Sequence, residues 1–304
     1  MKRCIAWCLA ALTLLFCCAA CGKTESLRQV TINEVTRSVF YAPLYVAASK
    51  GYFEAEGMTV EIVTGGGSDK SMTALLAGEA DVALMGPETG IYVVNQGQKD
   101  HPMIVAQLTK RDGSFLLGRE ANDAFDWEEE PGKDVEVISN IQFNLIGGAF
   151  EGGTGDYVAL FEPVASQFAS QGKGHILANM GLESGEVPYT TFMVRPETIE
   201  KDAEFVTAFV RAIYKAQKWV QTATDEEVAE AMQPYFPDTD LATLAAVAKS
   251  YRATDSWTTD PIMTEDSFTR LQDVIDGAGE LTARVALPTL VDNSFAQAVV
   301  KEVG

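Results

Sequence analysis

Cysteine is missing from this 304-residue chain beyond Cys21, so the residues that follow can form no disulfide and offer no thiol nucleophile. Histidine is almost as scarce, because the chain has only His101 and His175, and neither lies in a spacing typical of metal ligands. No GxSxG segment frames a serine, and the glycine-rich loop at 152–155 lacks the Lys-Ser/Thr of a phosphate loop. We therefore expect no catalytic residue, no metal, no cofactor and no enzymatic activity.

Basic side chains are also few, with 23 Lys and Arg against 43 Asp and Glu and a formal net charge of −20. A chain this acidic lacks the positive surface that binds nucleic acid, and it would not adsorb to anionic lipid by charge. We interpret the negative charge as a solvated surface that keeps the protein soluble. No nucleic-acid partner is expected.

Long hydrophobic runs are absent except near the N-terminus, where 5–20 is almost wholly apolar or small. Two basic residues precede this run, and its last two residues are alanines that come directly before Cys21. A basic start, an apolar stretch and small residues before a cysteine are typical of a bacterial lipoprotein signal. The pattern predicts a signal peptide at 1–20, lipidation of Cys21, and a short tether at 21–27.

Two other interpretations of the N-terminus stay open, an ordinary secretory signal and a short membrane anchor. Cys18 stands where a lipoprotein signal usually has an aliphatic residue. The apolar run is shorter than the roughly 20 residues of a membrane-spanning helix. The short run argues against a spanning helix, and we expect a lipid on Cys21 to hold the protein at the outer face of the cytoplasmic membrane.

Strand and helix patterns alternate along the first third of the chain after this signal. Strands are predicted at 28–35, 58–63, 81–85 and 103–109, with helices at 43–50, 69–76 and 88–95 between them. Because strands alternate with helices, we predict a parallel sheet with right-handed crossovers.

The rest of the chain is less regular in its middle and helical towards its end. Further strands are predicted at 115–118, 135–138, 157–161, 175–178 and 190–194, and helices at 204–222, 225–232, 241–251 and 264–278. Thr224 and Glu227 have the spacing of a capping box at a helix N-terminus. An acidic stretch at 121–133 has no periodicity.

Several segments resemble one known family, above all YAPLYVAASKGYFEAEGMTVEI (41–62) and LLAGEADVALMGPE (75–88). The match extends through DGSFLLGRE, GDYVALFEPVAS, VPYTTFMV and LVDNSFA, and it covers nearly all of the chain after Cys21. These segments resemble the substrate-binding proteins of ABC importers, in the group that includes nitrate, sulfonate, taurine and thiamine-pyrimidine-precursor binders. The resemblance implies an α/β fold of the two-lobed type II periplasmic-binding class, with the ligand between the lobes.

The resemblance also implies boundaries for the two lobes. Lobe one is expected at 28–109 plus 195–285, lobe two at 110–194, and a C-terminal tail at 286–304. Family members usually have a further strand, a glycine-rich turn and a helix near the start of lobe two, but 118–135 is too short for such a crossover. We infer that lobe two is shortened by one strand–helix unit and has lost part of its ligand wall. Either another strand pairing replaces the missing one, or the protein is a truncated variant that folds weakly.

Ligands of open parallel sheets lie beyond the carboxyl ends of the strands, in the loops that lead into helices. These loops and the resemblance give the candidate ligand-binding residues. They are Arg37, Phe40, Tyr41, Gly66, Gly67, Ser68, Gly86, Pro87, Glu88, Glu162 and Tyr189.

Each kind of candidate has a structural alternative beside its binding role. Ser68 opens a helix whose free N–H groups suit an oxyanion, but its glycines equally suit a plain turn. Phe40 and Tyr41 suit stacking on a planar ring, or packing in a core beside the hinge. Arg37 suits a ligand anion or solvent, and Glu162 suits an amine or the N-terminus of the helix that follows it.

The resemblance implies a monomeric solute-binding lipoprotein that delivers a small molecule to an ABC permease and its ATPase. The ligand would be a small nitrogen heterocycle like a thiamine pyrimidine precursor, or a sulfonate- or nitrate-type anion. Two alternatives stay open: a ligand-sensing lipoprotein that signals to a membrane partner, and, on fold relatives alone, an enzyme like a thiamine-precursor synthase.

Overall fold

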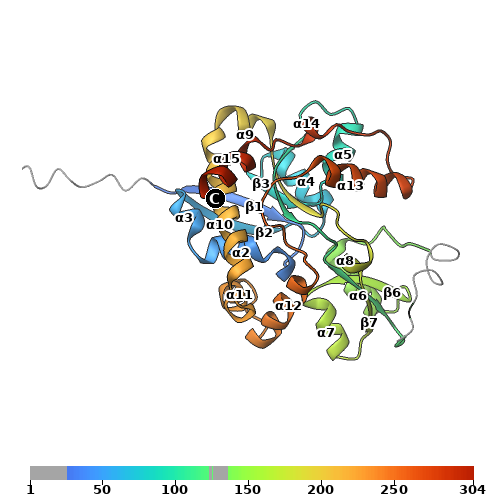
Figure 1. Cartoon of the computed structure of the whole chain (residues 1–304). Helices are drawn as coiled ribbons and strands as arrows, with labels where there is room; N and C mark the ends of the chain where they lie inside the picture. The colour runs from blue at the N-terminus through green and yellow to red at the C-terminus, as the bar shows by residue number, and fades with distance from the viewer. Residues whose placement is uncertain (1–25, 123–124, 126–135) are drawn as a thin grey trace, which may run out of the picture.

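The computed structural model of the chain describes residues 26–122, 125 and 136–304 (Figure 1). The predicted signal peptide and Cys21 lie outside these residues. The described chain forms two lobes, each with its own β-sheet, which confirms the predicted two-lobed α/β class. A search of the described helices finds none long and apolar enough to cross a membrane.

Lobe one is built on a five-stranded sheet with the strand order β2-β1-β3-β8-β4. Its strands are β1 (Arg28–Glu34), β2 (Met58–Thr64), β3 (Val82–Met85), β4 (Met103–Thr109) and β8 (Thr190–Val194). β1 is parallel to β2 and to β3, as predicted, whereas β8 is antiparallel to both of its neighbours. β8 lies in this sheet although the expected boundaries place 190–194 in lobe two.

Helices cover both faces of this sheet. One group is η1 (Val39–Tyr41), α2 (Ala42–Ser49), α3 (Tyr52–Ala55), α10 (Ala203–Thr222), α11 (Asp225–Met232), η3 (Gln233–Tyr235), α12 (Leu241–Ala253) and α15 (Ser294–Val303). The other group is α4 (Ser68–Ala77), α5 (Glu88–Asn95), α13 (Glu265–Gly277) and α14 (Leu287–Leu290), and α9 (Pro196–Lys201) precedes α10. The C-terminal helix α15 packs on α10, so 294–303 is part of the lobe-one body.

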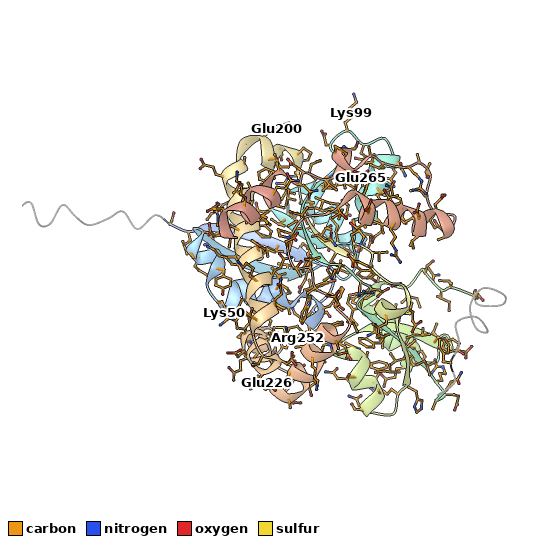
Figure 2. All side chains as sticks on the ribbon, in the orientation of Figure 1. Lys50, Lys99, Glu200, Glu226, Arg252 and Glu265 are labelled. Carbon is orange, nitrogen blue, oxygen red and sulfur yellow. The ribbon has the colours of Figure 1, made fainter. Side chains whose placement is uncertain are left out.

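The two faces of the lobe-one sheet bury two separate apolar cores. Val82 and Leu84 of β3 pack with the α10 side, whereas Ala83 and Met85 pack with the α4 side. This alternation follows from the two-residue period of a strand. Acidic side chains such as Glu226 point away from these cores into solvent (Figure 2).

Local signals in the sequence fix several helix ends. Thr224 and Glu227 form the predicted capping box at the start of α11. Gly51 follows α2 with a φ of 70°, a conformation that glycine adopts without the strain of a Cβ atom. Along α10 the predicted apolar stripe is buried, with Phe209 stacked on Phe53 at 5.5 Å between ring centres.

Lobe two is smaller and has a three-stranded sheet with the order β6-β5-β7. Its elements are β5 (Ser114–Gly118), η2 (Phe143–Leu145), α6 (Ile146–Glu151), β6 (Tyr157–Phe161), α7 (Val164–Ser170), β7 (His175–Asn179) and α8 (Met180–Glu183). β5 is antiparallel to both neighbours, so the parallel arrangement predicted from lobe one does not extend here.

The strand predicted at 135–138 is wrong for its described residues. Residues 136–138 form no strand, and the side chain of Val137 is 80 % exposed. An extended segment is stabilised by hydrogen bonds to a neighbouring strand, and no described strand pairs with this one.

The lobes are joined by two chain crossings and by contacts of α12. Tyr251 of α12 donates a hydrogen bond to the carbonyl of Gly113 (2.9 Å) and accepts one from the N–H of Glu162 (3.0 Å). The hydroxyl of Ser38 also donates to the carbonyl of Glu162 (2.7 Å). These buried bonds connect lobe two to lobe one at the base of the gap between them.

Candidate functional site

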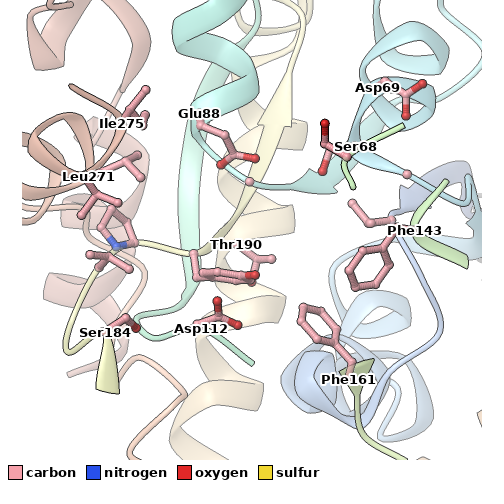
Figure 3. A pocket seen from close by; sticks show the side chains of 18 of the residues that line it. Ser68, Asp69, Glu88, Asp112, Phe143, Phe161, Ser184, Thr190, Leu271 and Ile275 are labelled. Atoms are coloured by element: carbon pink, nitrogen blue, oxygen red, sulfur yellow. The ribbon is translucent and has the colours of Figure 1, made fainter. Parts of the chain in front are cut away.

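A cavity of about 670 Å³ lies between the two lobes. Its volume is typical of sites for small molecules. Residues of both lobes and of both crossings line it (Figure 3). They are Val35, Tyr41, Gly67, Ser68, Asp69, Gly86, Glu88, Asp112, Ser139, Asn140, Ile141, Gln142, Phe143, Phe161, Ser184, Val187, Pro188, Tyr189, Thr190, Leu271, Val274 and Ile275.

Lobe one contributes the N-terminus of α4 to the cavity. The first backbone bonds of this helix run from Lys70 and Ser71 to the carbonyl of Gly67, both at 3.1 Å. Within the described residues, the N–H groups of Ser68 and Asp69 therefore have no backbone acceptor. They lie where β1 and β3 end, as the topology of a parallel sheet requires.

Glu88 places a carboxylate in the same cavity from the first residue of α5. The carboxylate folds back over Gly86, where a Cβ atom would lie 2.1 Å from both of its oxygens. Glycine at 86 is therefore what leaves room for this carboxylate. Desolvation by the surrounding walls raises the pKa of Glu88 to about 7, and a hydrogen bond from its own backbone only partly offsets that rise.

Asp112 contributes a second carboxylate, from the crossing that leads from β4 into lobe two. It accepts hydrogen bonds from the N–H (2.7 Å) and the hydroxyl (2.6 Å) of Ser114, and Tyr189 also bonds to it. Burial nevertheless raises its pKa. Figure 3 shows Asp112 and Glu88 on either side of Thr190, facing the same space.

Aromatic rings form one side of the cavity. Phe161 of lobe two lies 5.1 Å from Phe143 and 6.4 Å from Tyr41, measured between ring centres. Tyr189 lies 6.1 Å from Phe161. Such a wall suits a flat or a cationic group, because ring faces attract both.

The cavity brings together six of the eleven predicted ligand-binding residues, from four separate parts of the sequence. They are Tyr41, Gly67, Ser68, Gly86, Glu88 and Tyr189. The other five lie outside its lining. Gly66 and Pro87 are adjacent turn residues that shape the backbone, and Gly66 has a φ of 92°.

Arg37 faces away from the cavity and has structural partners. Its Nε atom lies 3.0 Å from a carboxylate oxygen of Glu34, and its guanidinium group lies over the rings of Tyr45 and Tyr235. Glu34 is fully buried, and desolvation raises its pKa to about 7 even though Arg37 lowers it. Arg37 is not part of the cavity lining, and its side chain is 32% exposed beside these partners.

Phe40 and Glu162 take the structural roles that were left open for them. Phe40 is fully buried beside the hinge, 5.2 Å from the ring of Tyr251. The carboxylate of Glu162 accepts hydrogen bonds from the N–H (2.9 Å) and the hydroxyl (2.7 Å) of Ser166, in the first turn of α7. It therefore stabilises a helix N-terminus and does not line the cavity.

The other lining residues were not predicted, and three groups of them show what signal the sequence did or did not offer. Asp112 lies just beyond the carboxyl end of β4. The other loops were predicted from this same position after a strand, so the same rule would have predicted Asp112. Leu271 and Ile275 have ordinary core spacing on α13, so the sequence cannot distinguish them from core residues. Residues 139–143 follow an aperiodic stretch, and no motif marks them.

Known proteins resemble this chain over nearly its whole length. Residues 39–116 match the family model described as NMT1/THI5 like. YtlA of Bacillus subtilis, by its name a candidate binding protein, is 41% identical, and the alignment covers 97% of each chain. The chain belongs to the family of YtlA.

Solved structures with the same fold include proteins from several bacteria. The periplasmic nitrate-binding protein NrtA of Synechocystis has a TM-score of 0.72 at 16% identity, covering 91% of this chain and 89% of NrtA. The alkanesulfonate-binding protein SsuA of Xanthomonas axonopodis, bound to MOPS, has a TM-score of 0.66 at 14% identity, covering 88% and 98%. A ligand-binding component of an ABC-type import system from Staphylococcus aureus, with zinc bound, has a TM-score of 0.72 at 15% identity, covering 90% and 99%.

The chain is shorter than its Bacillus relative within the aligned region. The alignment with YtlA extends over 323 positions, more than the 304 residues of this chain, although it covers 97% of both. Part of YtlA therefore has no counterpart here. This difference agrees with the inferred loss of a strand–helix unit.

Proposed function

We propose that this protein is the solute-binding lipoprotein of an ABC importer. It captures a small solute in the cavity between its lobes and delivers it to a permease, with import driven by the permease's ATPase. The observation that carries the proposal is the 670 Å³ cavity, which residues of both lobes line. Membership of the family of YtlA supports a binding role.

The proposed mechanism is closure of the lobes around the solute. A solute that touches both Glu88 of lobe one and Phe161 of lobe two gains contacts only when the lobes are close. It therefore shifts the population towards the closed form by as much as it prefers that form. The permease then distinguishes loaded from empty protein by the relative position of the lobes.

The proposed location is the outer face of the cytoplasmic membrane, with Cys21 carrying the lipid and 22–27 acting as a tether. A Cys21→Ser variant should lose incorporation of radiolabelled palmitate and move from the membrane to the soluble fraction. Wild-type protein without the label would contradict the lipid anchor.

The binding proposal can be tested by thermal shift on the folded protein without its signal peptide. The first probes are aminopyrimidines, aliphatic sulfonates, taurine and nitrate, which cover the solute classes suggested by the sequence and by the names of structural relatives. A solute at 100 times its Kd should add about 2.7 kcal/mol to the free energy of unfolding. If none of them raises the melting temperature, the proposal fails.

A pair of variants on α13 shows whether binding occurs in this cavity. Val274 lines the cavity and is 56% exposed, so Val274→Trp should fill the mouth of the cavity without disturbing the core. Thr269 is also exposed on α13 but does not line the cavity, which makes Thr269→Trp the matched control. Only the Val274 variant should lose the shift, and loss in neither would place binding elsewhere.

A further inference from the structure

The cavity has an unusual charge for a fold whose relatives are named for nitrate and sulfonates. Its described lining includes Asp69, Glu88 and Asp112 and contains no lysine, arginine or histidine. Asp69 lies 3.7 Å from Lys70, whereas Glu88 and Asp112 form no ion pair within the described chain. An anion held beside these two carboxylates would find no basic side chain in the described lining to pair with. The charge of the lining therefore favours a ligand of the opposite sign.

We propose that the cavity binds a small organic cation, with a charged nitrogen placed between the carboxylates of Glu88 and Asp112. This inference rests on the proposed function, because it specifies the solute of the same cavity. It also predicts that simple sulfonates and nitrate are poor ligands.

Within the described chain, no basic residue forms an ion pair with Glu88 or Asp112, and Arg111 has one buried guanidinium nitrogen without a hydrogen-bond partner. Lys110 lies 2.8 Å from Asp255, and Arg111 donates to the carbonyl of Gly181. Arg37 is paired with Glu34 on the other side of the loop. Within the described chain, the carboxylate of Glu88 has only its own backbone N–H as a hydrogen-bond donor. A ligand with N–H groups would supply further hydrogen-bond donors to this carboxylate.

Aromatic groups beside the carboxylates suit the same ligand. Tyr41 is 1% exposed and lines the cavity. Phe143, Phe161 and Tyr189 complete the wall. Ring faces attract a cation, and they do so more strongly when water is excluded.

The helix N-termini of the cavity favour an anion, but each of the two helices has an acidic side chain in its first turn. The α5 N-terminus has the carboxylate of Glu88 on its first N–H. The α4 N-terminus has Asp69 in its first turn, and a Cβ atom at Gly67 would lie 2.6 Å from an Asp69 oxygen. A helix terminus carries only about half a positive charge, which does not outweigh the carboxylates.

The experiment compares probes that differ in one charged nitrogen. Taurine is paired with isethionate, which has a hydroxyl in place of the ammonium, and 4-amino-5-aminomethyl-2-methylpyrimidine is paired with its 5-hydroxymethyl analogue. Tetramethylammonium and nitrate are compared as simple ions at equal ionic strength. Affinities are measured by calorimetry at pH 8, which is above the pKa of about 7 of Glu88.

The ammonium member of at least one pair should bind about tenfold or more tightly than its hydroxyl partner, as expected for hydrogen bonds to charged groups. The double variant Glu88→Gln, Asp112→Asn should reduce that ratio to near one, because both amides keep the size of the side chains. Glu79→Gln removes an exposed carboxylate outside the cavity and is the matched control. It should leave the ratio unchanged.

The possible results separate the two proposals. Binding of nitrate or isethionate as tightly as the cationic probes overturns the cation proposal and leaves the solute-binding function intact. A preference for the ammonium that survives in the double variant also overturns it. If no probe of either charge binds, both proposals fall.

Discussion

The two lobes differ in how completely they bury their apolar surface. Every residue of β3 and β8 in lobe one is buried, whereas most of β6 and β7 in lobe two is partly or fully exposed. Lobe two also holds most of the exposed large apolar side chains, namely Val137, Ile138, Leu145, Tyr157, Val164, Ile176 and Leu182. The smaller lobe has helices and strands of its own but too little core to stabilise them fully.

This difference shows how a hinged binding protein divides its tasks. Lobe one is a scaffold that carries Ser68 and Glu88 on rigid helix termini. Lobe two depends on contacts with lobe one, such as those of Tyr251, and elements with few buried contacts open at low free-energy cost. We therefore expect lobe two to open locally while lobe one remains folded.

The largest expected effect is in the core of lobe one. Phe209 is 1% exposed and packs on Phe53 and Phe192. Phe209→Ala should lower the free energy of global unfolding by about 3–5 kcal/mol, because it removes apolar contacts and leaves a cavity. Urea denaturation measures this loss, and a loss below about 1 kcal/mol would contradict the assignment of this core.

The equivalent change in lobe two provides the comparison. Phe150 is also 1% exposed and lies under the guanidinium group of Arg119 at 4.2 Å. Phe150→Ala should speed hydrogen exchange in β5, β6 and β7 and leave β1 and β3 almost unchanged. Equal acceleration in both sheets would show that the lobes unfold as one unit.

The hinge offers the next effect. Tyr251→Phe removes both hydrogen bonds from the hydroxyl to lobe two and leaves the buried N–H of Glu162 without its acceptor. Opening of lobe two should become easier by about 1–3 kcal/mol, the cost of an unsatisfied buried group. Hydrogen exchange of β5 and β6 measures it. Tyr214→Phe is the control, because the described structure shows no hydrogen bond to that hydroxyl; the idea is wrong if both variants behave alike.

The smallest effect concerns the cavity and depends on pH. The pKa of Glu88 is about 7 in the folded protein against 4.5 as its ordinary value, so the folded state holds the proton more tightly. The stability due to this group is fully present below pH 4.5 and is lost as the pH rises through 7. Glu88→Gln has no such loss.

The variant should therefore gain stability over the wild type as the pH rises from 5 to 8, by on the order of 1–3 kcal/mol. Urea denaturation of both proteins at the two pH values measures the change. Glu34 titrates in both proteins, so its contribution cancels. A stability difference between the two proteins that stays constant over this pH range would contradict the raised pKa.

Local patterns predicted most elements of lobe one. Three examples are the alternation at Val82–Met85, the apolar stripe along α10 and the capping box at Thr224. Each depends on residues that are neighbours in the sequence, so the sequence predicts it. The strand at 135–138 failed for the opposite reason. Its residues favour a strand, but strand formation requires a partner from elsewhere in the chain.

The site shows the same division. Ser68, Gly86 and Glu88 were predicted because the ends of parallel strands meet at one edge of a sheet. Arg37 and Glu162 were expected at the site but have partners inside their own lobes. Asp112 was missed although it follows a predicted strand. Side-chain direction decided the cases of Arg37 and Glu162, and composition and spacing do not specify it, whereas Asp112 has the same strand-end position as the residues that were predicted.

The sequence by itself determined the α/β class, the helix ends and the family, because periodicity, capping residues and extended motifs act along the chain. Only the tertiary structure decided which side chains share the cavity and that none of the described ones is basic. It also decided that Arg37 pairs with Glu34. The physical reason is that burial, pKa and pairing depend on groups brought together from distant segments, and these groups meet only when both lobes have folded.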